Sequence, residues 1–282
     1  MTTTATITAD QKARIARVGH LAANAYRDLD LDGTLEFYRR RYVVQAERFR
    51  TIDANTRILD IGAGYGWLAL AFALGTPAHV TAIEVDAERL AAGREIAGIL
   101  GLSDRISWRG EPLGAIGLPD GSADIVYCVE VLEHVGGDPR AVRDLARLST
   151  DLVILTTPNG WFPAVAHDTR LPFAHWLPKD ARHAYARALG RDKGEIDNHF
   201  WSPVAIDREL REFDVVSGFL HYRSLADYLA TYPFYLPYLD GGSLEQTRPG
   251  RLKLAYYRLA STLGRHSRYV LPNLAAVYRR RW

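Results

Sequence analysis

The chain has 282 residues, of which 48% are hydrophobic and 24% are charged, as in an ordinary folded globular protein. This length is enough for one large domain with a substantial core, and it excludes a disordered or peptide-like chain. The 35 basic and 33 acidic side chains give a formal net charge of +2, so the large positive excess of a dedicated nucleic-acid binder is absent and a small-molecule partner is favoured.

The single cysteine, Cys128, excludes an internal disulfide and a zinc site built from cysteines. The most apolar window, residues 67–83, contains Gly75, Pro77 and His79 and is too short to cross a membrane. The threonine-rich start has no apolar stretch of the kind found in signal peptides. We therefore expect a cytoplasmic protein without a membrane-spanning segment.

The first 50 residues are predicted to be helical. Residues 10–25 have a helix-forming composition, and residues 35–50 place Leu35, Tyr38 and Tyr42 along one helical face. We expect residues 1–50 to form an N-terminal helical lid.

From residue 57 onward, short β-branched runs alternate with segments rich in alanine and leucine, which is the pattern of a parallel sheet covered by helices on both faces. The expected strands are residues 57–61, 79–84, 106–109, 125–129 and 152–156. The expected helices are residues 67–74, 87–100 and 139–148. Residues 51–160 are thus predicted to form a doubly wound, Rossmann-like α/β core whose sheet is mostly parallel.

The remainder of the chain is predicted to be a cap followed by the end of the sheet. Residues 158–160, Pro-Asn-Gly, end the fifth strand, and residues 161–204 are dense in aromatic, histidine, proline and arginine side chains, which suggests a substrate cap. Residues 205–282 are expected to complete the sheet around a helical, aromatic insertion. They include a helix at 205–212 and strands at 213–220 and 273–280 that form an antiparallel edge.

Residues 57–67 carry the strongest motif of the sequence. They read Arg-Ile-Leu-Asp-Ile-Gly-Ala-Gly-Tyr-Gly-Trp, which is a buried strand, three glycines at alternate positions and the start of a helix. Such a turn lets the backbone approach a ligand closely and aims helix N-terminal amides at it. Trp67 occupies the position where the dinucleotide fingerprint G-x-G-x-x-G requires its third glycine, so that fingerprint fails.

The run D-x-G-x-G-x-G resembles the class I S-adenosylmethionine-dependent methyltransferases, and in particular small-molecule O-methyltransferases of the ubiquinone and sugar type. The resemblance covers about residues 60–159 and implies S-adenosyl-L-methionine as the cofactor. It also implies that Glu84, 24 residues after Asp60, binds the ribose hydroxyls and that Glu111 contacts the adenine amino group. The full expected cofactor site is Asp60, Gly62, Ala63, Gly64, Gly66, Glu84, Val85, Glu111, Pro112 and Glu130.

Methyl transfer from a sulfonium requires the acceptor to be positioned and its proton to be removed. His134 follows the fourth strand, where open α/β sheets hold their ligands, and an imidazole accepts protons near neutral pH. His167 and Asp168 in the cap complete the expected catalytic set. The alternatives are that His134 packs against the cofactor loop and that the cap residues form a polar loop satisfying itself.

A metal centre is a further alternative. Glu130, Glu133, His134 and Asp168 offer oxygen and imidazole ligands that suit Mg²⁺ or Mn²⁺. Since no spacing among these residues is diagnostic, no metal ligand is assigned and Mg²⁺ stays an alternative to a metal-free site.

The cap favours a saccharide hydroxyl as the methyl acceptor, because aromatic rings stack on sugars beside histidines and carboxylates. The resemblance to the ubiquinone type leaves a lipidic quinol, a phenol or a polyketide hydroxyl open. A protein that binds S-adenosylmethionine without transferring its methyl group is the alternative from another class. A nucleic-acid acceptor is disfavoured, because no Asn/Asp-Pro-Pro-Tyr-like tetrad follows the fourth strand.

The C-terminal region is aromatic and basic, which suits sugar stacking, a membrane surface or simple core packing. The residues concerned are Tyr228, Tyr232, Phe234, Tyr235, Tyr238, Arg248, Arg251, Lys253, Arg258, Arg265 and Arg268.

Overall fold

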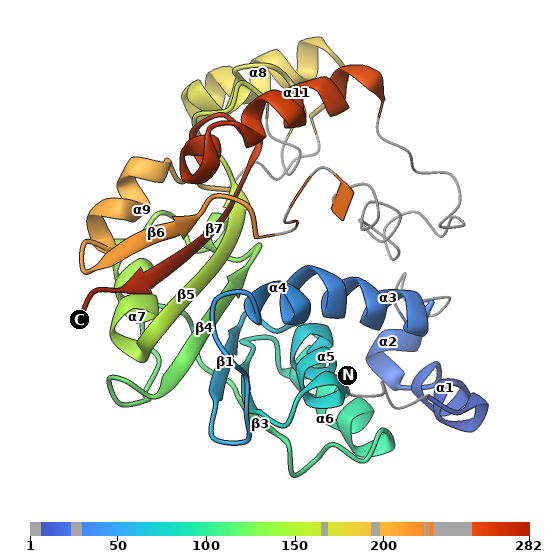
Figure 1. The fold of residues 1–282 in the computed structure, drawn as a ribbon. Coiled ribbons are helices and arrows are strands. Elements are labelled where there is room, and N and C mark those ends of the chain that lie inside the picture. The colour runs from blue at the N-terminus through green and yellow to red at the C-terminus, as the bar shows by residue number, and fades with distance from the viewer. Residues whose placement is uncertain are drawn as a thin grey trace.

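Figure 1 shows the computed structural model of the chain, which describes residues 7–23, 30–164, 169–192, 198–220, 222, 224, 226–227 and 250–282. The strands are β1 (Arg57–Ile61), β2 (His79–Ile83), β3 (Ile106–Arg109), β4 (Ala123–Val129), β5 (Ser149–Pro158), β6 (Phe213–Ser217) and β7 (Asn273–Arg280). The α-helices are α1 (Ala9–Ile15), α2 (Gly19–Ala23), α3 (Leu31–Tyr38), α4 (Val44–Ala46), α5 (Trp67–Gly75), α6 (Ala87–Ile99), α7 (Pro139–Leu148), α8 (Lys179–Ala188), α9 (Pro203–Glu209) and α11 (Arg251–Ser261).

The strands form one seven-stranded sheet in the order β3-β2-β1-β4-β5-β7-β6. The first five strands pair in parallel, and β7 pairs antiparallel with both β5 and β6. The predicted α/β fold with an antiparallel C-terminal edge is therefore confirmed. Because the chain leaves β1 first towards β2 and later returns to β4, the carboxyl ends of β1 and β4 flank the point where such sheets bind ligands.

Helices cover both faces of the sheet and create two separate cores (Figure 1). On one face, α5, α6 and the N-terminal helices bury Phe72, Ile96 and Tyr127 with the sheet. On the other face, α7 and α9 pack Leu145 and Ile206 against it. β1, β2, β4 and β5 contribute to both cores, which is why these four runs are almost continuously apolar, whereas the edge strand β3 contributes Ile106 and Trp108 to the first core only.

The N-terminal helices differ in detail from the prediction. The expected helix at residues 10–25 is divided into α1 and α2, and residues 24 and 25 lie outside the described part of the chain. The expected helix at 35–50 begins earlier, because Asp30 caps the start of α3, and it contains a π-helical turn, η1 (Arg39–Val43). These helices share the core that α5 and α6 form, so they are packed onto the sheet face.

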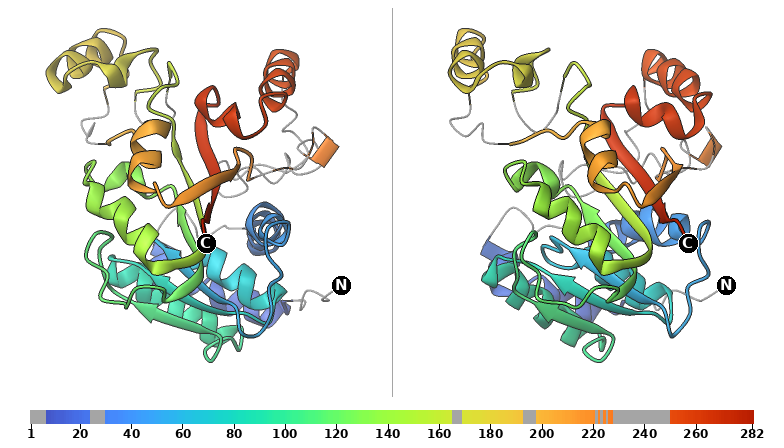
Figure 2. Two further views of the ribbon diagram at one scale, coloured as in Figure 1. Left: turned by 60° about the vertical axis from the view of Figure 1, so that its left-hand side comes forward. Right: turned by 90° about the vertical axis from the view of Figure 1, so that its left-hand side faces the viewer.

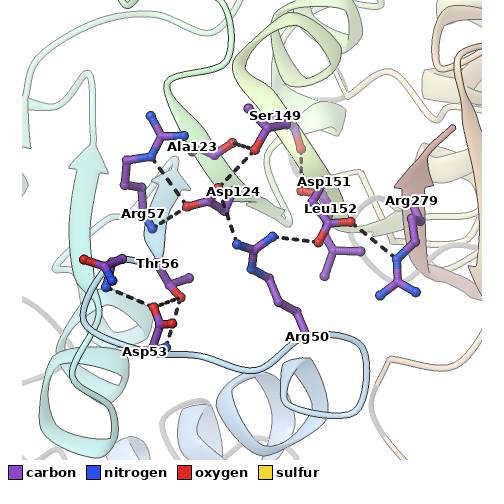
Figure 3. A network of polar contacts seen from close by, with 12 residues as sticks. Arg50, Asp53, Thr56, Arg57, Ala123, Asp124, Ser149, Asp151, Leu152 and Arg279 are labelled. Carbon is purple, nitrogen blue, oxygen red and sulfur yellow. Dashed lines mark hydrogen bonds and ion pairs between the residues drawn. The ribbon is translucent and has the colours of Figure 1, made fainter. Parts of the chain in front are cut away.

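A network of ion pairs closes the amino-terminal side of the sheet (Figure 3). Arg50, which follows α4, lies 2.8 Å from Asp151 and 3.5 Å from Asp124, and Arg279 of β7 lies 3.4 Å from Asp151. Burial would raise the pKa of Asp124, but hydrogen bonds from Arg57 and Thr150 and the charge of Arg50 hold it below its usual range. The network joins the N-terminal helices to β1, β4, β5 and β7.

The cap contains a helix, α8, that its aromatic and basic composition did not predict. The short 3-10 turn η3 (Ala174–Trp176) precedes α8, and Figure 2 places α8 and α11 at the same end of the molecule, away from the N-terminal helices. None of the described helices is long and apolar enough to cross a membrane.

Candidate functional site

The glycine loop lies at the carboxyl end of β1, and its backbone conformation requires glycine. Gly62, Gly64 and Gly66 have φ values of +72°, +57° and +79°, a region that residues with a side chain rarely adopt. A Cβ atom on Gly62 would lie 2.2 Å from Val131, and one on Gly66 would lie 2.3 Å from Trp108. The loop is thus held between β3 and the turn that follows β4.

Glu84 follows β2 and organises the side of the loop that Gly64 forms. One carboxylate oxygen accepts a hydrogen bond from the backbone N–H of Gly64 at 2.7 Å, and the other accepts one from Asp86 at 2.9 Å. A Cβ atom on Gly64 would meet nothing within 4 Å. A buried carboxylate and a backbone that a ligand can approach closely are therefore brought together.

Asp60, at the carboxyl end of β1, is fully buried, and its Oδ2 has no hydrogen-bond partner in the described part of the chain. Burial raises the pKa of Asp60 from 3.8 to about 7, the charge of Glu84 adds to this rise, and a hydrogen bond from the backbone of Ala69 opposes it. A buried carboxylate with an unused oxygen fits a cationic or hydrogen-bond-donating ligand beside the loop.

The expected adenine side of the site is built from the ends of β2 and β3. Glu111 accepts hydrogen bonds of 2.7 Å from Arg109 and from the backbone of Gly117, which lower its pKa although burial opposes them. Val85 is 65% exposed and Pro112 is also exposed, so two apolar side chains face solvent at adjacent strand ends. This arrangement provides apolar surface for a ring and a carboxylate beside it.

The turn after β4 carries Glu130, Glu133 and His134. Glu130 has a φ of +54° and donates its backbone N–H to Thr156 of β5. Glu133 is fully buried and accepts a hydrogen bond from Thr157 at 2.9 Å, whereas His134 is exposed. Glu133 therefore ties the turn to β5, and His134 is left accessible to an acceptor.

His199 lies against this turn and was not identified from the sequence. Its backbone N–H donates to the carbonyl oxygen of Glu133 at 2.9 Å, and a Cβ atom on Gly137 would lie 2.8 Å from its ring. Burial lowers the pKa of His199 below 6.5, which favours the neutral imidazole at pH 7. The surrounding residues Asn198, Phe200 and Trp201 form no recognisable motif, so only the tertiary structure reveals this position.

The other predicted catalytic residues, His167 and Asp168, lie outside the described residues. Of the neighbouring cap, His175 and Trp176 each donate a ring N–H to the carbonyl oxygen of Gly160, at 3.1 and 2.7 Å. His175 is therefore engaged in holding η3 near the end of β5. In the described part of the chain, no group of three or more His, Cys, Asp or Glu side chains has the arrangement of a metal site.

Comparisons with known proteins identify the core. Residues 59–155 match the family model described as a methyltransferase domain. These residues form a class I S-adenosylmethionine-dependent methyltransferase domain. Its cofactor is S-adenosylmethionine, and the loop opposite Glu84 together with the unused oxygen of Asp60 fits a cationic cofactor of this kind.

Curated relatives of the methyltransferase domain match it over part of their length. A 27-O-demethylrifamycin SV methyltransferase of Amycolatopsis mediterranei is 27% identical over 42% of this chain and 44% of its own. A ubiquinone biosynthesis O-methyltransferase of Bordetella bronchiseptica is 32% identical over 38% of this chain and 41% of its own. The chain thus spans less than half the length of these two relatives.

A solved structure supports the fold over nearly the whole chain. The protein is a putative sarcosine dimethylglycine methyltransferase of Galdieria sulphuraria, with 14% identity and a TM-score of 0.53 over 96% of this chain and 98% of its own. At this level of identity the similarity establishes only the fold of the chain.

Replacing Glu84 by glutamine tests the cofactor site. Glu84→Gln removes the charge and one hydrogen-bond acceptor beside Gly64, and we expect the affinity for S-adenosylhomocysteine to fall by about 10- to 100-fold in isothermal titration calorimetry. Glu95→Gln on the exposed side of α6 is the matched control. Equal affinities of Glu84→Gln and the wild type would contradict the ribose assignment.

The buried carboxyl of Asp60 gives a pH dependence of stability. Because folding raises its pKa from 3.8 to about 7, the folded protein keeps a proton that the unfolded chain loses between these values. The ligand-free wild type therefore loses stability as the pH rises through this interval, and Asp60→Asn lacks this loss. The Tm of the variant minus that of the wild type is expected to increase with pH between these two values. A difference that does not depend on pH would refute the raised pKa of Asp60.

Proposed function

We propose that this protein is an S-adenosylmethionine-dependent methyltransferase that methylates a hydroxyl group of a small molecule. The observation that carries the proposal is the loop held by Glu84, with Asp60 beneath it, at the carboxyl edge of the sheet. The cofactor supplies an electrophilic methyl group on its sulfonium. The chain's own residues must then bind the cofactor, orient the acceptor and take up the hydroxyl proton.

His134 is our first candidate for the proton acceptor. His134 is exposed on the turn after β4. Val131 of the same turn packs against Gly62 of the cofactor loop. A base on this turn lies at the edge where the cofactor is expected. His199 is the second candidate, because it packs against the same turn and burial lowers its pKa, which favours the neutral form that can accept a proton.

The acceptor proposed here is an aromatic or lipidic hydroxyl compound, such as a phenol or a quinol. One similar protein is named for 27-O-demethylrifamycin SV and another for ubiquinone biosynthesis, and neither name denotes a saccharide. The cap adds exposed rings, since Trp161 is 49% exposed and Phe173 and Trp176 are 52% and 53% exposed. Such rings provide apolar contact area for an aromatic acceptor.

A saccharide is the second candidate acceptor. The same exposed tryptophans suit stacking on a sugar ring, and the hydrogen bond from Trp176 to Gly160 holds its indole in one orientation. The two classes are therefore best separated by direct measurement of the product.

Incubation with methyl-labelled S-adenosylmethionine and a panel of phenols, quinols and oligosaccharides tests the function. We expect label in a phenol or quinol, with mass spectrometry placing the methyl group on oxygen. A labelled saccharide would replace our first acceptor class with the second. Binding of S-adenosylhomocysteine without transfer to any acceptor would instead support a protein that binds the cofactor and does no chemistry.

Substitution of the two histidines distinguishes the proton acceptors. His134→Ala is expected to lower kcat by about 100-fold, the usual contribution of one acid-base group, while the affinity for S-adenosylhomocysteine stays unchanged. If His199 is the base, His199→Gln shows that loss instead. The wild-type kcat then reaches its plateau at a lower pH than a histidine of ordinary pKa would give, because burial lowers the pKa of His199. Retention of full kcat by both variants at saturating acceptor would exclude both residues.

A further inference from the structure

The outward side of α11 is a stripe of large apolar side chains. Leu252 is 88% exposed, Leu259 is 69% exposed and Leu263, in the turn that follows the helix, is 45% exposed. Tyr256, which is 37% exposed, lies four residues after Leu252, and Leu259 and Leu263 lie seven and eleven residues after it. This spacing places all four side chains on one face of the helix. We call these four residues the α11 stripe. The inward side of the helix carries the buried Ala260.

The C-terminal segment that carries the α11 stripe has no acidic side chain. Residues 250–282 contain eight arginine and lysine side chains and no aspartate or glutamate. The remaining 249 residues therefore hold 35 minus 8, or 27, basic side chains against 33 acidic ones. The small net charge of the whole chain thus conceals a basic C-terminal segment on an acidic protein.

Three basic residues near the α11 stripe differ in their ion pairing from the arginines at the end of β7 and just after it. Arg279, Arg280 and Arg281 form ion pairs with Asp151, Glu212 and Asp214. Within the described ranges, by contrast, no ion pair joins an acid to Arg251, Arg258 or Arg265. Arg251 and Arg258 are seven residues apart and lie on one side of the α11 stripe, which follows from the helical period. The α11 stripe is therefore bordered on the Arg251 and Arg258 side by cations that form no ion pair within the described ranges.

The α11 stripe continues into the cap. The ring of Tyr256 lies 6.4 Å from that of Phe162, and the ring of Tyr269, in the turn η6 (Gly264–Tyr269), lies 5.8 Å from that of Trp161. Trp161 is itself 49% exposed. Since Trp161 follows β5 almost directly, the α11 stripe adjoins the carboxyl edge of the sheet.

Hydrogen bonds fix this region to the rest of the fold. Asn159 donates its side-chain amide to the carbonyl oxygens of Arg268 and Leu271, at 3.0 and 2.8 Å. The guanidinium of Arg268 is buried and forms a two-pronged ion pair with Asp207 of α9. Figures 1 and 2 show α11 at the end of the molecule towards which β5 runs, where the cap also lies.

We propose that the α11 stripe docks on the surface of a bilayer that contains anionic lipids. A helix with an apolar face, flanking cations and a neighbouring tryptophan has the properties of an interfacial helix that lies in the plane of a membrane. Docking would bring the carboxyl edge of the sheet close to the lipid, where an acceptor dissolved in the membrane is accessible. The docking itself rests on α11 and does not depend on the proposed chemistry.

Other occupants of this face fit the observations less well. A second copy of the chain would bring two basic segments together, which opposes pairing. Nucleic acid would contact the cations but would leave exposed leucines without a partner. An acidic protein groove satisfies both features and is separated from a bilayer by the experiment below.

Flotation of the full chain with vesicles tests the proposal. We expect the protein to bind vesicles of equimolar phosphatidylcholine and phosphatidylglycerol, more weakly at high salt, and to bind phosphatidylcholine alone poorly. Arg251→Glu with Arg258→Glu should weaken binding by at least about 25-fold, at about fivefold for each cation lost. Leu252→Glu with Leu259→Glu should weaken it by at least about tenfold through loss of apolar burial.

Val204→Glu, at a side chain of α9 that is 50% exposed, is the matched control and should bind like the wild type. S-adenosylhomocysteine affinity, measured for every variant, reports folding and keeps this test separate from that of the methyltransferase activity. The proposal is overturned by failure to bind anionic vesicles, by equal loss in the Val204→Glu control, or by binding that the leucine substitutions leave unchanged. A dimer in sedimentation velocity that the leucine substitutions dissociate, without vesicle binding, would assign the face to a second copy.

Discussion

The packing of the glycine loop between two neighbouring elements is the constraint on which the site depends. Gly62 lies against Val131 and Gly66 lies against Trp108, at distances that exclude even one added methyl group. This leaves the backbone of Gly64 between the two contacts, with its N–H directed at Glu84. The site is therefore made by three strands at once, and a change in the turn after β4 is transmitted directly to the cofactor loop.

Buried ionisable side chains have two different roles in this molecule. Asp60, at the carboxyl end of β1, forms no ion pair with any described residue, and burial disfavours its ionised form. Asp207 and Arg268 instead neutralise each other and join α9 to η6, which positions the segment leading to β7. An isolated buried carboxyl suits a site that awaits a ligand, whereas a paired one suits a permanent junction between elements.

The core was predicted well and the surrounding elements less well, for a local reason. Four of the parallel strands are buried on both faces and appear in sequence as short apolar runs, so their positions were predicted to within a few residues. The π-helical turn at Arg39–Val43 and the helix α8 have no such signal. Tyr42 is buried in that turn by packing against Tyr127, a residue remote in sequence.

The fold class, the glycine loop and the order of acidic residues at successive strand ends could be predicted from the sequence, because each depends on the spacing of residues close together in the chain. Only the tertiary structure placed His199 beside the turn that carries His134, since the two are 65 residues apart. It also distinguished the paired Arg279 and Arg280 of β7 from Arg251, Arg258 and Arg265, which form no ion pair within the described ranges, and composition alone cannot make this distinction. Both depend on contacts between distant segments, and these arise only when the sheet and its helices pack together.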